Sequence, residues 1–237
     1  VHPVKAPYLP YAWYLPETRR LTDLAAFRSG QIYPQDVSSM LVAEAAGAKA
    51  GDNILDLCAA PGGKSLHLAD KMNGFGMVLA RDLTDEKVAL INENIQRLDC
   101  INMHAEVKDA TVFDPQCEGK MDIVICDVPC SGFGVLAKKP DIRYKDVASA
   151  AGLPKIQRDI LERAATCVEN GGILVYSTCT VLPAENEELV NAFLADHKEF
   201  SLLPFSVGEL HVNGMITLTP HAHGTDGFFL AKMQKGQ

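Results

Sequence analysis

Residues 53–72 have the sequence NILDLCAAPGGKSLHLADKM, and this stretch decides the predicted fold. Residues 53–57 form a short apolar segment that is typical of a buried strand. A turn of small residues, Cys58 to Lys64, follows, and the segment from Ser65 to Met72 is expected to be a helix. A strand, a glycine-rich turn and a helix in this order predict one unit of an open α/β sheet, in which ligands bind at the carboxyl ends of the strands.

The same alternation of strand and helix continues along the chain. Further strands are predicted at residues 76–80, 103–107, 122–126 and 173–177, and helices at residues 35–46, 85–98, 154–168 and 184–197. Asn170, Gly171 and Gly172 are expected to end the helix before the last parallel strand, and residues 200–203 and 228–233 to pair antiparallel at the sheet edge. The predicted fold class is therefore α/β, a doubly wound, mostly parallel, Rossmann-like sheet with a C-terminal antiparallel edge.

Length and composition indicate one large globular domain. The chain has 237 residues, of which 47% are hydrophobic and 22% charged, values that are ordinary for a soluble protein. We expect one α/β domain over residues 35–237, and residues 1–34 as an N-terminal arm or the end of a preceding domain. No apolar run approaches the roughly 20 residues that span a bilayer. The missing initiator Met indicates a fragment or a processed chain, and the first residues do not form a signal peptide.

Seven cysteines occur without metal-ligand spacing, which indicates a reduced, cytoplasmic setting. Two of them, Cys130 and Cys179, each follow a short hydrophobic run that predicts a buried parallel strand. Taken separately, each is explained as a buried packing residue, and a disulfide between them is disfavoured in a reduced compartment. Their common position at strand ends favours covalent chemistry on a substrate instead. The remaining cysteines are expected to be packing residues: Cys58, Cys100, Cys117, Cys126 and Cys167.

The net charge is −8 and the isoelectric point about 5.3, which argues mildly against a nucleic-acid partner. The loop after Cys130 nevertheless carries four cations, here called the basic loop patch: Lys138, Lys139, Arg143 and Lys145. A patch of this kind can bind phosphates even on an acidic protein. The alternative interpretation is a solvated surface without a function, which is the more common case. Three histidines near the C-terminus lack an acid or cysteine at ligand spacing, so an exposed loop is favoured over a metal site. They are His211, His221 and His223.

The turn after the first strand is expected to hold a nucleoside cofactor. Its residues are Cys58, Ala59, Ala60, Pro61, Gly62, Gly63 and Lys64. Gly62 and Gly63 let the backbone approach a ligand, and the following helix start offers free N–H groups. The turn lacks the glycine spacing of dinucleotide and Walker loops. Asp82 and Asp109 end the next two strands, where carboxylates can accept from ribose hydroxyls and from an adenine amino group. S-adenosylmethionine is a nucleoside without phosphates and suits such a cradle.

Two thiols and a carboxylate beside such a cradle suit methylation of carbon 5 of a pyrimidine. That carbon is a poor nucleophile until a thiolate adds to carbon 6. An acid near ring nitrogen 3 helps the addition, and a base must then remove the carbon-5 proton so that the thiol can leave. Cys179, Asp127 and Cys130 supply a thiol, a carboxyl group and a second thiol at adjacent strand ends.

At these residues the chain resembles the RNA (cytosine-5) methyltransferases of the Fmu and NOL1/NOP2/Sun family. The matching motifs are AAPGGK at residues 59–64, DVPCSG at 127–132, STCTVLPAEN at 177–186 and DGFF at 226–229. KPDIRY at residues 139–144 is most similar to the Fmu branch, which modifies small-subunit ribosomal RNA. The resemblance runs from about residue 20 to residue 233, with the motifs in the family's order.

The resemblance implies S-adenosylmethionine-dependent methylation of carbon 5 of a cytosine in RNA, with ribosomal RNA as the partner. Residues 35–237 would be the catalytic domain, which is assumed to be monomeric. Cys179 would be the nucleophile, Cys130 would assist product release, and Asp127 would contact the target base and the cofactor. The turn from Cys58 to Lys64 would hold the methionine part of the cofactor. The other implied roles are the ribose for Asp82 and Lys87, the adenine side for Asp109, and support of the site for Gln35 and Asp36.

Three other classes share parts of this pattern. DNA cytosine-5 methyltransferases place the nucleophile in a Pro-Cys-Gln turn, whereas Ser131 follows Cys130 here, so a DNA partner is not expected. Amino-group methyltransferases typically have an aromatic residue after Pro-Pro where this chain has Pro129 and Cys130. A binding module that assists ribosome assembly without turnover is the third alternative, and Cys179 and Asp127 argue against it. Nothing resembles the NusB-like N-terminal domain of Fmu-type proteins, so we expect the catalytic part of a longer protein or another source of RNA affinity.

Overall fold

One eight-stranded sheet forms the centre of the computed structural model, which describes residues 2–17 and 20–237. The strand order is β11-β12-β7-β6-β3-β4-β5, and β8 also pairs with β12. The strands are β3 (Asn53–Asp56), β4 (Met77–Asp82), β5 (Met103–Val107), β6 (Met121–Asp127), β7 (Val168–Thr178), β8 (Phe200–Leu202), β11 (Met215–Leu218) and β12 (Phe228–Lys235). Neighbours among β3 to β7 are parallel, whereas β12 is antiparallel to β7, β8 and β11. The predicted α/β fold with a C-terminal antiparallel edge is confirmed.

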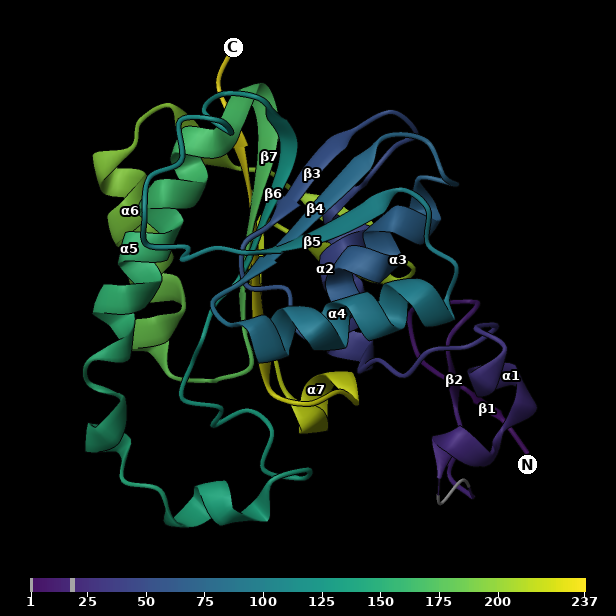
Figure 1. Cartoon of the computed structure of the whole chain (residues 1–237). Helices are drawn as coiled ribbons and strands as arrows, with labels where there is room; N and C mark the ends of the chain where they lie inside the picture. Colours follow the sequence, from purple (N-terminus) through teal and green to yellow (C-terminus); the bar gives the residue numbers. More distant parts are fainter. Residues whose placement is uncertain (1, 18–19) are drawn as a thin grey trace.

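Helices cover both faces of this sheet (Figure 1). On one face lie α2 (Val37–Ala46), α3 (Gly63–Lys71) and α4 (Asp85–Arg97), and on the other α5 (Leu153–Cys167) and α6 (Glu187–Asp196). Strand residues alternate between two cores: Ile123 and Ile125 of β6 pack under α2 to α4, and Val124 and Cys126 under α5 and α6. Because both faces are buried, the strands are continuous apolar runs without polar alternation. Among residues 2–17 and 20–237, no helix has the length and apolar content needed to cross a membrane.

Two predicted helix starts differ by a residue or two from the observed ones. The helix expected from residue 35 begins at Val37, because Asp36 accepts a hydrogen bond from the Ser38 N–H at 2.9 Å and is the N-cap. The helix expected from Pro154 begins one residue earlier, at Leu153, with the proline in its first turn as predicted. These are shifts of a residue or two in elements whose existence was predicted correctly.

The junction between α5 and β7 contradicts the sequence prediction. The helix ends at Cys167 and β7 begins directly at Val168, so Asn170, Gly171 and Gly172 do not separate them. Met121 of β6 pairs with Val168 but Ile123 pairs with Ile173, so β7 holds extra residues in a bulge. Gly171 has a φ of +83°, and a Cβ on Gly172 would lie 3.0 Å from the Glu169 carbonyl oxygen. The glycines therefore serve the bulge inside a strand, not the end of a helix.

The smaller elements were not predicted, because two to four residues carry too little periodicity. They are the pair β1 (Val4–Lys5) and β2 (Trp13–Tyr14), the pair β9 (Phe205–Val207) and β10 (Leu210–Val212), and the short helices α1 (Ala25–Arg28) and α7 (Pro220–His223). The predicted antiparallel pairing of the late strands is confirmed, since Phe200 lies opposite Lys235.

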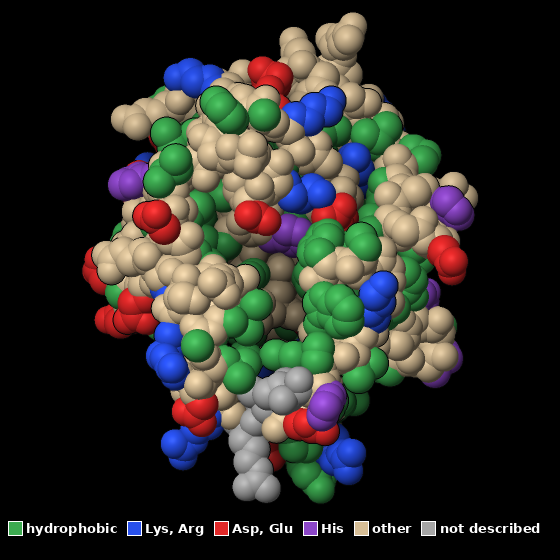
Figure 2. Space-filling model, turned by 90° about the vertical axis from the view of Figure 1, so that its right-hand side faces the viewer, with side chains coloured by type: hydrophobic (Ala, Val, Ile, Leu, Met, Phe, Trp, Pro, Cys, Tyr) green, Lys and Arg blue, Asp and Glu red, His purple; other side chains and the backbone are tan. Residues whose placement is uncertain are grey.

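The N-terminal segment packs on the face that carries α2 to α4. Leu9 and Ala12 are buried in the same core as Val212, and Arg97 at the end of α4 donates to the carbonyls of Phe27 at 2.9 Å and Ile32 at 3.2 Å. Between this segment and the helices lies a hollow of about 890 Å³, bordered by apolar side chains (Figure 2). The predicted cysteine and aspartate site residues do not line this hollow. The division of the chain at residue 35 stays a prediction.

Candidate active site

The carboxyl ends of β6 and β7 bring together three of the predicted site residues. Asp127 ends β6 opposite Ser177 of β7, whose hydroxyl donates to Asp127 Oδ1 at 2.7 Å. Lys64, from the start of α3, donates its ammonium group to Asp127 Oδ2 at 2.6 Å. Cys179 follows β7 directly. The turn after β3 and the ends of β6 and β7 therefore meet at one point of the sheet rim, as expected for parallel strands.

The two thiols predicted for covalent chemistry are in contact. Cys130 Sγ and Cys179 Sγ lie 3.1 Å apart, and both are free thiols. The hydrogen bond from Cys130 lowers the pKa of Cys179, and the nearby Lys64 acts in the same direction, while burial and Asp127 oppose them. The same hydrogen bond, together with burial, raises the pKa of Cys130. This pair therefore stabilises a thiolate on Cys179 with Cys130 as its hydrogen-bond donor.

Cys179 is the one cysteine of the chain whose pKa is lowered. Burial is the main cause that raises the pKa of each of the five predicted packing cysteines, Cys58, Cys100, Cys117, Cys126 and Cys167. Around Cys58 the carboxylates of Asp56, Asp82 and Asp127 add to the effect of burial. Cys58 lies in the cradle but is thus kept as a neutral thiol, which leaves Cys179 as the nucleophile favoured by the electrostatics of the site.

Several polar residues that hold the cysteine loops were not singled out from the sequence. Ser131 Oγ and Thr180 Oγ1, each in the residue that follows a cysteine, lie 2.8 Å apart. The Ser131 N–H donates to Glu185 Oε2 at 2.9 Å, and Gln157 Nε2 of α5 donates to the same oxygen at 2.7 Å. Three of these residues lie in motifs quoted from the sequence, Ser131 in the 127–132 motif and Thr180 and Glu185 in the 177–186 motif, whereas Gln157 lies in none of them.

A backbone crossing ties the cysteine loops to the last strand of the sheet. The Gly134 N–H donates to the Cys179 carbonyl at 2.9 Å, and the Gly227 N–H donates to the Gly134 carbonyl at 2.9 Å. A Cβ on Gly134 would clash with the Gly227 carbonyl oxygen, so the two chains can approach this closely only without a side chain there. The motifs around Cys130, Cys179 and Asp226–Phe229 are thus three parts of one structure.

The cradle residues and Asp82 form a second connected group. Gly62 has a φ of +105° and precedes α3, whose first turn carries Gly63 and Lys64. The Asp82 carboxylate accepts from the Ala60 N–H at 2.9 Å and from Lys87 Nζ at 2.8 Å. The predicted proximity of Asp82, Lys87 and the turn is therefore observed.

A model of the family described as 16S rRNA methyltransferase RsmB/F matches residues 44–234. The chain belongs to this family. Among curated relatives, the "Probable ribosomal RNA small subunit methyltransferase B" of Bacillus subtilis is 43% identical over 218 residues, which cover 88% of this chain and 49% of the relative. The "Ribosomal RNA small subunit methyltransferase F" of Serratia proteamaculans is 33% identical over 229 residues, 92% of this chain and 48% of the relative. The chain spans about half the length of the curated relatives it matches.

Solved structures agree with the RsmB/F assignment. NSun6 from Pyrococcus horikoshii, solved with SFG, has a TM-score of 0.79 and 31% identity over 93% of this chain and 57% of its own. A methyltransferase homolog protein from the same organism has a TM-score of 0.82 and 28% identity over 99% of this chain and 78% of its own. The predicted resemblance to the Fmu and NOL1/NOP2/Sun family is confirmed, and this is a family of S-adenosylmethionine-dependent methyltransferases.

The RsmB/F cradle has features that fit S-adenosylmethionine. The left-handed Gly62 leaves the N-terminus of α3 open toward the rim, with a helix dipole but no phosphate loop. Asp82 still has acceptor capacity on Oδ2, and the exposed Leu83 beside it offers an apolar surface to a base. The role predicted for Gly63 stays a prediction; a Cβ there would also clash with the Tyr33 hydroxyl of the N-terminal segment.

Asp56, at the end of β3 beneath the cradle, was missed by the sequence analysis. It is fully buried and accepts from the Ser65 hydroxyl at 2.6 Å. Burial is the main cause that raises the pKa of Asp56 to about 6, and the neighbouring Asp127 adds to it. The sequence did carry a signal, an acidic residue within the apolar segment 53–57. The prediction used only the turn that follows it, Cys58 to Lys64.

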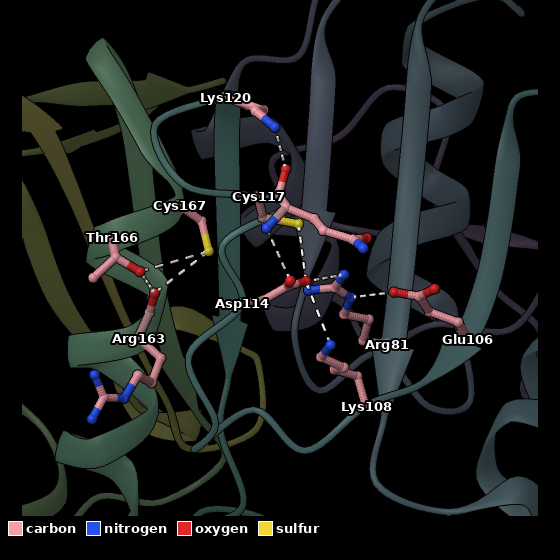
Figure 3. Close-up of polar contacts among 10 residues, drawn as sticks. Arg81, Glu106, Lys108, Asp114, Cys117, Lys120, Arg163, Thr166 and Cys167 are labelled. Atoms are coloured by element: carbon pink, nitrogen blue, oxygen red, sulfur yellow. Dashed lines mark hydrogen bonds and ion pairs between the residues drawn. The ribbon is translucent and has the colours of Figure 1, made fainter.

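Asp109, which was predicted to contact the adenine, is exposed in the loop after β5. Its carboxylate accepts from the N–H and the hydroxyl of Thr111 at 2.8 and 2.7 Å. The loop that follows is anchored by the buried Arg81, which pairs with Glu106 at 2.6 Å and Asp114 at 2.7 Å (Figure 3). The contacts described for Asp109 do not reach the cradle. Its role at the adenine therefore stays a prediction.

Two residues of the basic loop patch have partners within the protein, and the other two are exposed. Lys138 forms ion pairs with Asp36 and, at 2.7 Å, with Asp226, and Lys145 donates to the Ser131 carbonyl at 3.1 Å. Lys139 and Arg143 lie exposed at and within the short helix Pro140–Tyr144. Asp36 is joined to Lys138 and, through it, to Asp226, and its implied support of the site stays a prediction. Among the described residues, no three His, Cys, Asp or Glu side chains are grouped to hold a metal ion.

Proposed function

We propose that this domain methylates carbon 5 of a cytosine in RNA, with small-subunit ribosomal RNA as the substrate and S-adenosylmethionine as the methyl donor. The observation that carries the proposal is the contact of Cys179, the one cysteine whose pKa is lowered, with a second thiol 3.1 Å away. Methyl transfer to nitrogen or oxygen needs no thiol pair, whereas transfer to carbon 5 needs a nucleophile that adds and later leaves. Membership of the RsmB/F family supports RNA as the substrate class.

In this mechanism the residues of the chain make and break one covalent bond. The Cys179 thiolate adds to carbon 6 of the cytosine, and Asp127 hydrogen-bonds near ring nitrogen 3 to favour the addition. S-adenosylmethionine, when bound, supplies an electrophilic methyl group, which becomes attached to carbon 5. A base then takes the carbon-5 proton, the bond between carbon 6 and sulfur breaks, and the Cys179 thiolate is restored. Cys130, in contact with that sulfur, assists this departure.

The target cytosine must leave its base stack to reach Cys179, because the thiol lies below the surface of the rim. We propose that the target cytosine binds at the sheet rim between Asp127 and the basic loop patch. The cradle from Cys58 to Lys64 would hold the methionine part of the cofactor, Asp82 and Lys87 the ribose, and Asp109 the adenine side. Residues 35–237 would be the catalytic domain of a monomeric, cytoplasmic enzyme, and residues 1–34 its N-terminal arm or the end of a preceding domain.

Two cysteine variants test the mechanism. We expect Cys179→Ala to abolish methylation of ribosomal RNA, and Cys130→Ala to accumulate a covalent RNA adduct that survives denaturing electrophoresis. Cys100→Ala is the matched control, since this half-buried thiol lies outside the site and its loss leaves methylation unchanged. Full activity of Cys179→Ala would refute the mechanism.

The target is tested separately from the mechanism. Bisulfite sequencing of ribosomal RNA from cells that lack the gene is expected to show the loss of one 5-methylcytosine. An unchanged 5-methylcytosine pattern in the small subunit would show that the substrate is another RNA.

A further inference from the structure

A cluster of buried polar side chains lies behind the two cysteines. It consists of Ser131, Gln157, Thr180 and Glu185, which are between 0 and 4% exposed, and is here called the polar lattice. Three separate parts of the chain supply these residues: the loop after β6, the helix α5 and the turn after β7. None of the four was assigned a role in the reaction above.

The lattice holds the backbone on both sides of Cys130. Gln157 Nε2 donates to the carbonyl of Pro129, the residue before Cys130, at 3.0 Å. Glu185 Oε2 accepts from the N–H of Ser131, the residue after Cys130, at 2.9 Å. Gln157 Nε2 also donates to Glu185 Oε2 at 2.7 Å, so the two supports of the Cys130 loop are linked to each other.

The same cluster is attached to the Cys179 loop. The Thr180 hydroxyl lies 2.8 Å from the Ser131 hydroxyl, and the Glu185 carbonyl accepts from the Tyr176 hydroxyl at 2.6 Å. Glu185 follows Cys179 on the chain and reaches back to the residue after Cys130. The lattice therefore fixes the two cysteine loops relative to one another.

Stability alone does not explain this arrangement. Glu185 is buried, and its described contacts include no Lys, Arg or His; Glu185 Oε1 and Gln157 Oε1 also lack hydrogen-bond partners among the described residues. A buried carboxylate that is held only by neutral donors costs free energy, and well-packed apolar side chains would be more stable there. A polar cluster that does not maximise stability, placed beside two reactive thiols, indicates a role in their geometry.

We propose that Glu185 and Gln157 are positioning residues that hold the Cys130 thiol against Cys179 for the release half of the reaction. This inference rests on the proposed function. The residues do not touch the substrate; they act through the peptide groups next to Cys130. Without them the Cys130 loop loses both supports, its sulfur moves away from Cys179, and the adduct between Cys179 and carbon 6 breaks down slowly.

The first test compares two variants in turnover with RNA. Gln157→Leu removes both donated hydrogen bonds at similar volume, and we expect the adduct to accumulate while kcat falls about tenfold to 100-fold, the effect of misplacing a reacting group by an ångström. Glu185→Gln keeps an oxygen that can accept from the Ser131 N–H and from Gln157 Nε2, so kcat is expected to stay within a few-fold of the wild type. Loss of turnover in Glu185→Gln would show that the charge acts directly and would overturn the positioning role.

The second test needs neither RNA nor cofactor, and so separates this inference from the proposed function. The rate of iodoacetamide alkylation at Cys179 is followed against pH, with peptide mass spectrometry to distinguish the seven cysteines. The charged groups that face Cys179, Lys64 and Asp127, are left intact. In the wild type we expect the hydrogen bond from Cys130 to hold the pKa of Cys179 below that of an ordinary thiol, and in Gln157→Leu the profile should move up because Cys130 no longer donates.

Folding is controlled with the double variant Gln157→Leu/Glu185→Leu, in which no buried charge is left without a partner. We expect it to unfold cooperatively, at a lower temperature than the wild type because the Ser131 N–H loses its acceptor, and still to show the shifted alkylation profile and the adduct. If Cys130→Ala traps no adduct, the proposed function fails. The alkylation test still shows whether Gln157 and Glu185 position the Cys130 thiol. A folded Gln157→Leu or double variant with an unshifted alkylation profile would overturn the proposal.

Discussion

The two halves of the site rim are built from different interactions. On the cofactor half, at the ends of β3 to β5, charges are paired: Lys87 with Asp82 and Arg81 with Asp114, while Lys64 of the cradle pairs with Asp127 at the end of β6 and joins the two halves. On the cysteine half, at the ends of β6 and β7, the polar lattice uses neutral donors around one carboxylate. Ion pairs near the surface weaken with salt and can exchange partners with a ligand, whereas buried neutral hydrogen bonds keep their geometry. The exposed Lys87 can therefore exchange Asp82 for a ligand, whereas the buried Arg81 pair is a fixed anchor and the cysteine half holds two atoms in place.

The largest effect should come from breaking the buried anchor of the cofactor half. Arg81→Leu leaves the buried Asp114 with only Lys108, 3.7 Å away, and we expect the free energy of unfolding to fall by at most about 3–5 kcal/mol. Chemical denaturation measures this. The matched control is Lys155→Ala, which breaks the exposed pair with Asp159 and should change the same quantity by less than about 0.5 kcal/mol. Equal losses in the two variants would contradict the buried anchor.

Removing the cation that joins the halves should affect activity next most strongly. Lys64→Met leaves Asp127 without its ion pair and Cys179 without a nearby positive charge. We expect a fall in kcat of about 100-fold, equal to about 2.7 kcal/mol, as for a misplaced reacting group. Lys71→Met is the control on the same helix, since Lys71 pairs with Glu44 away from the cysteines. Single-turnover methylation assays compare the two, and similar rates would separate Lys64 from the chemistry.

The third prediction concerns Asp56 beneath the cradle and uses pH. Its folded pKa of about 6 lies above the ordinary carboxyl value of about 3.9, so the folded state binds the proton more tightly. The free energy of unfolding should therefore fall as pH rises from about 4 to about 6, by about 2 kcal/mol from this group, and then level off. Asp56→Asn, which keeps the acceptor for Ser65, should remove this slope in denaturation curves at pH 4, 5, 6 and 7. A slope that persists in the variant would assign it to other groups.

The smallest effect is expected at the basic loop patch. Neutralising all four cations should weaken RNA binding and flatten its salt dependence, by about 0.7–0.9 in slope for each phosphate that a cation no longer neutralises. Lys139→Ala/Arg143→Ala should account for more of this change than Lys138→Ala/Lys145→Ala, because Lys138 and Lys145 already have partners within the protein. Filter binding at several salt concentrations measures the slopes, and an unchanged slope in the fourfold variant would remove the patch from the RNA site.

The fold and the contact of the main site residues could be predicted because they depend on local patterns. Alternating strands and helices impose a parallel sheet, whose strand ends share one rim, so Asp127, Cys130 and Cys179 had to be neighbours. The polar lattice could not be predicted in this way, because a buried glutamine on α5 has no periodic signature. Gly171 and Gly172 misled the prediction for a related reason: glycine is typical both of a helix end and of a strand bulge, and only the pairing of β6 with β7 decides between them.

The crossing of Gly134 and Gly227 bears on the order in which the molecule becomes reactive. During synthesis, the cradle and both cysteines emerge from the ribosome before Gly227 does. The Cys130 loop accepts a hydrogen bond from the Gly227 N–H, directly before β12, so this support is added only when β12 joins the sheet. The cysteine loops of a nascent chain therefore have the residues of the polar lattice available before this last support.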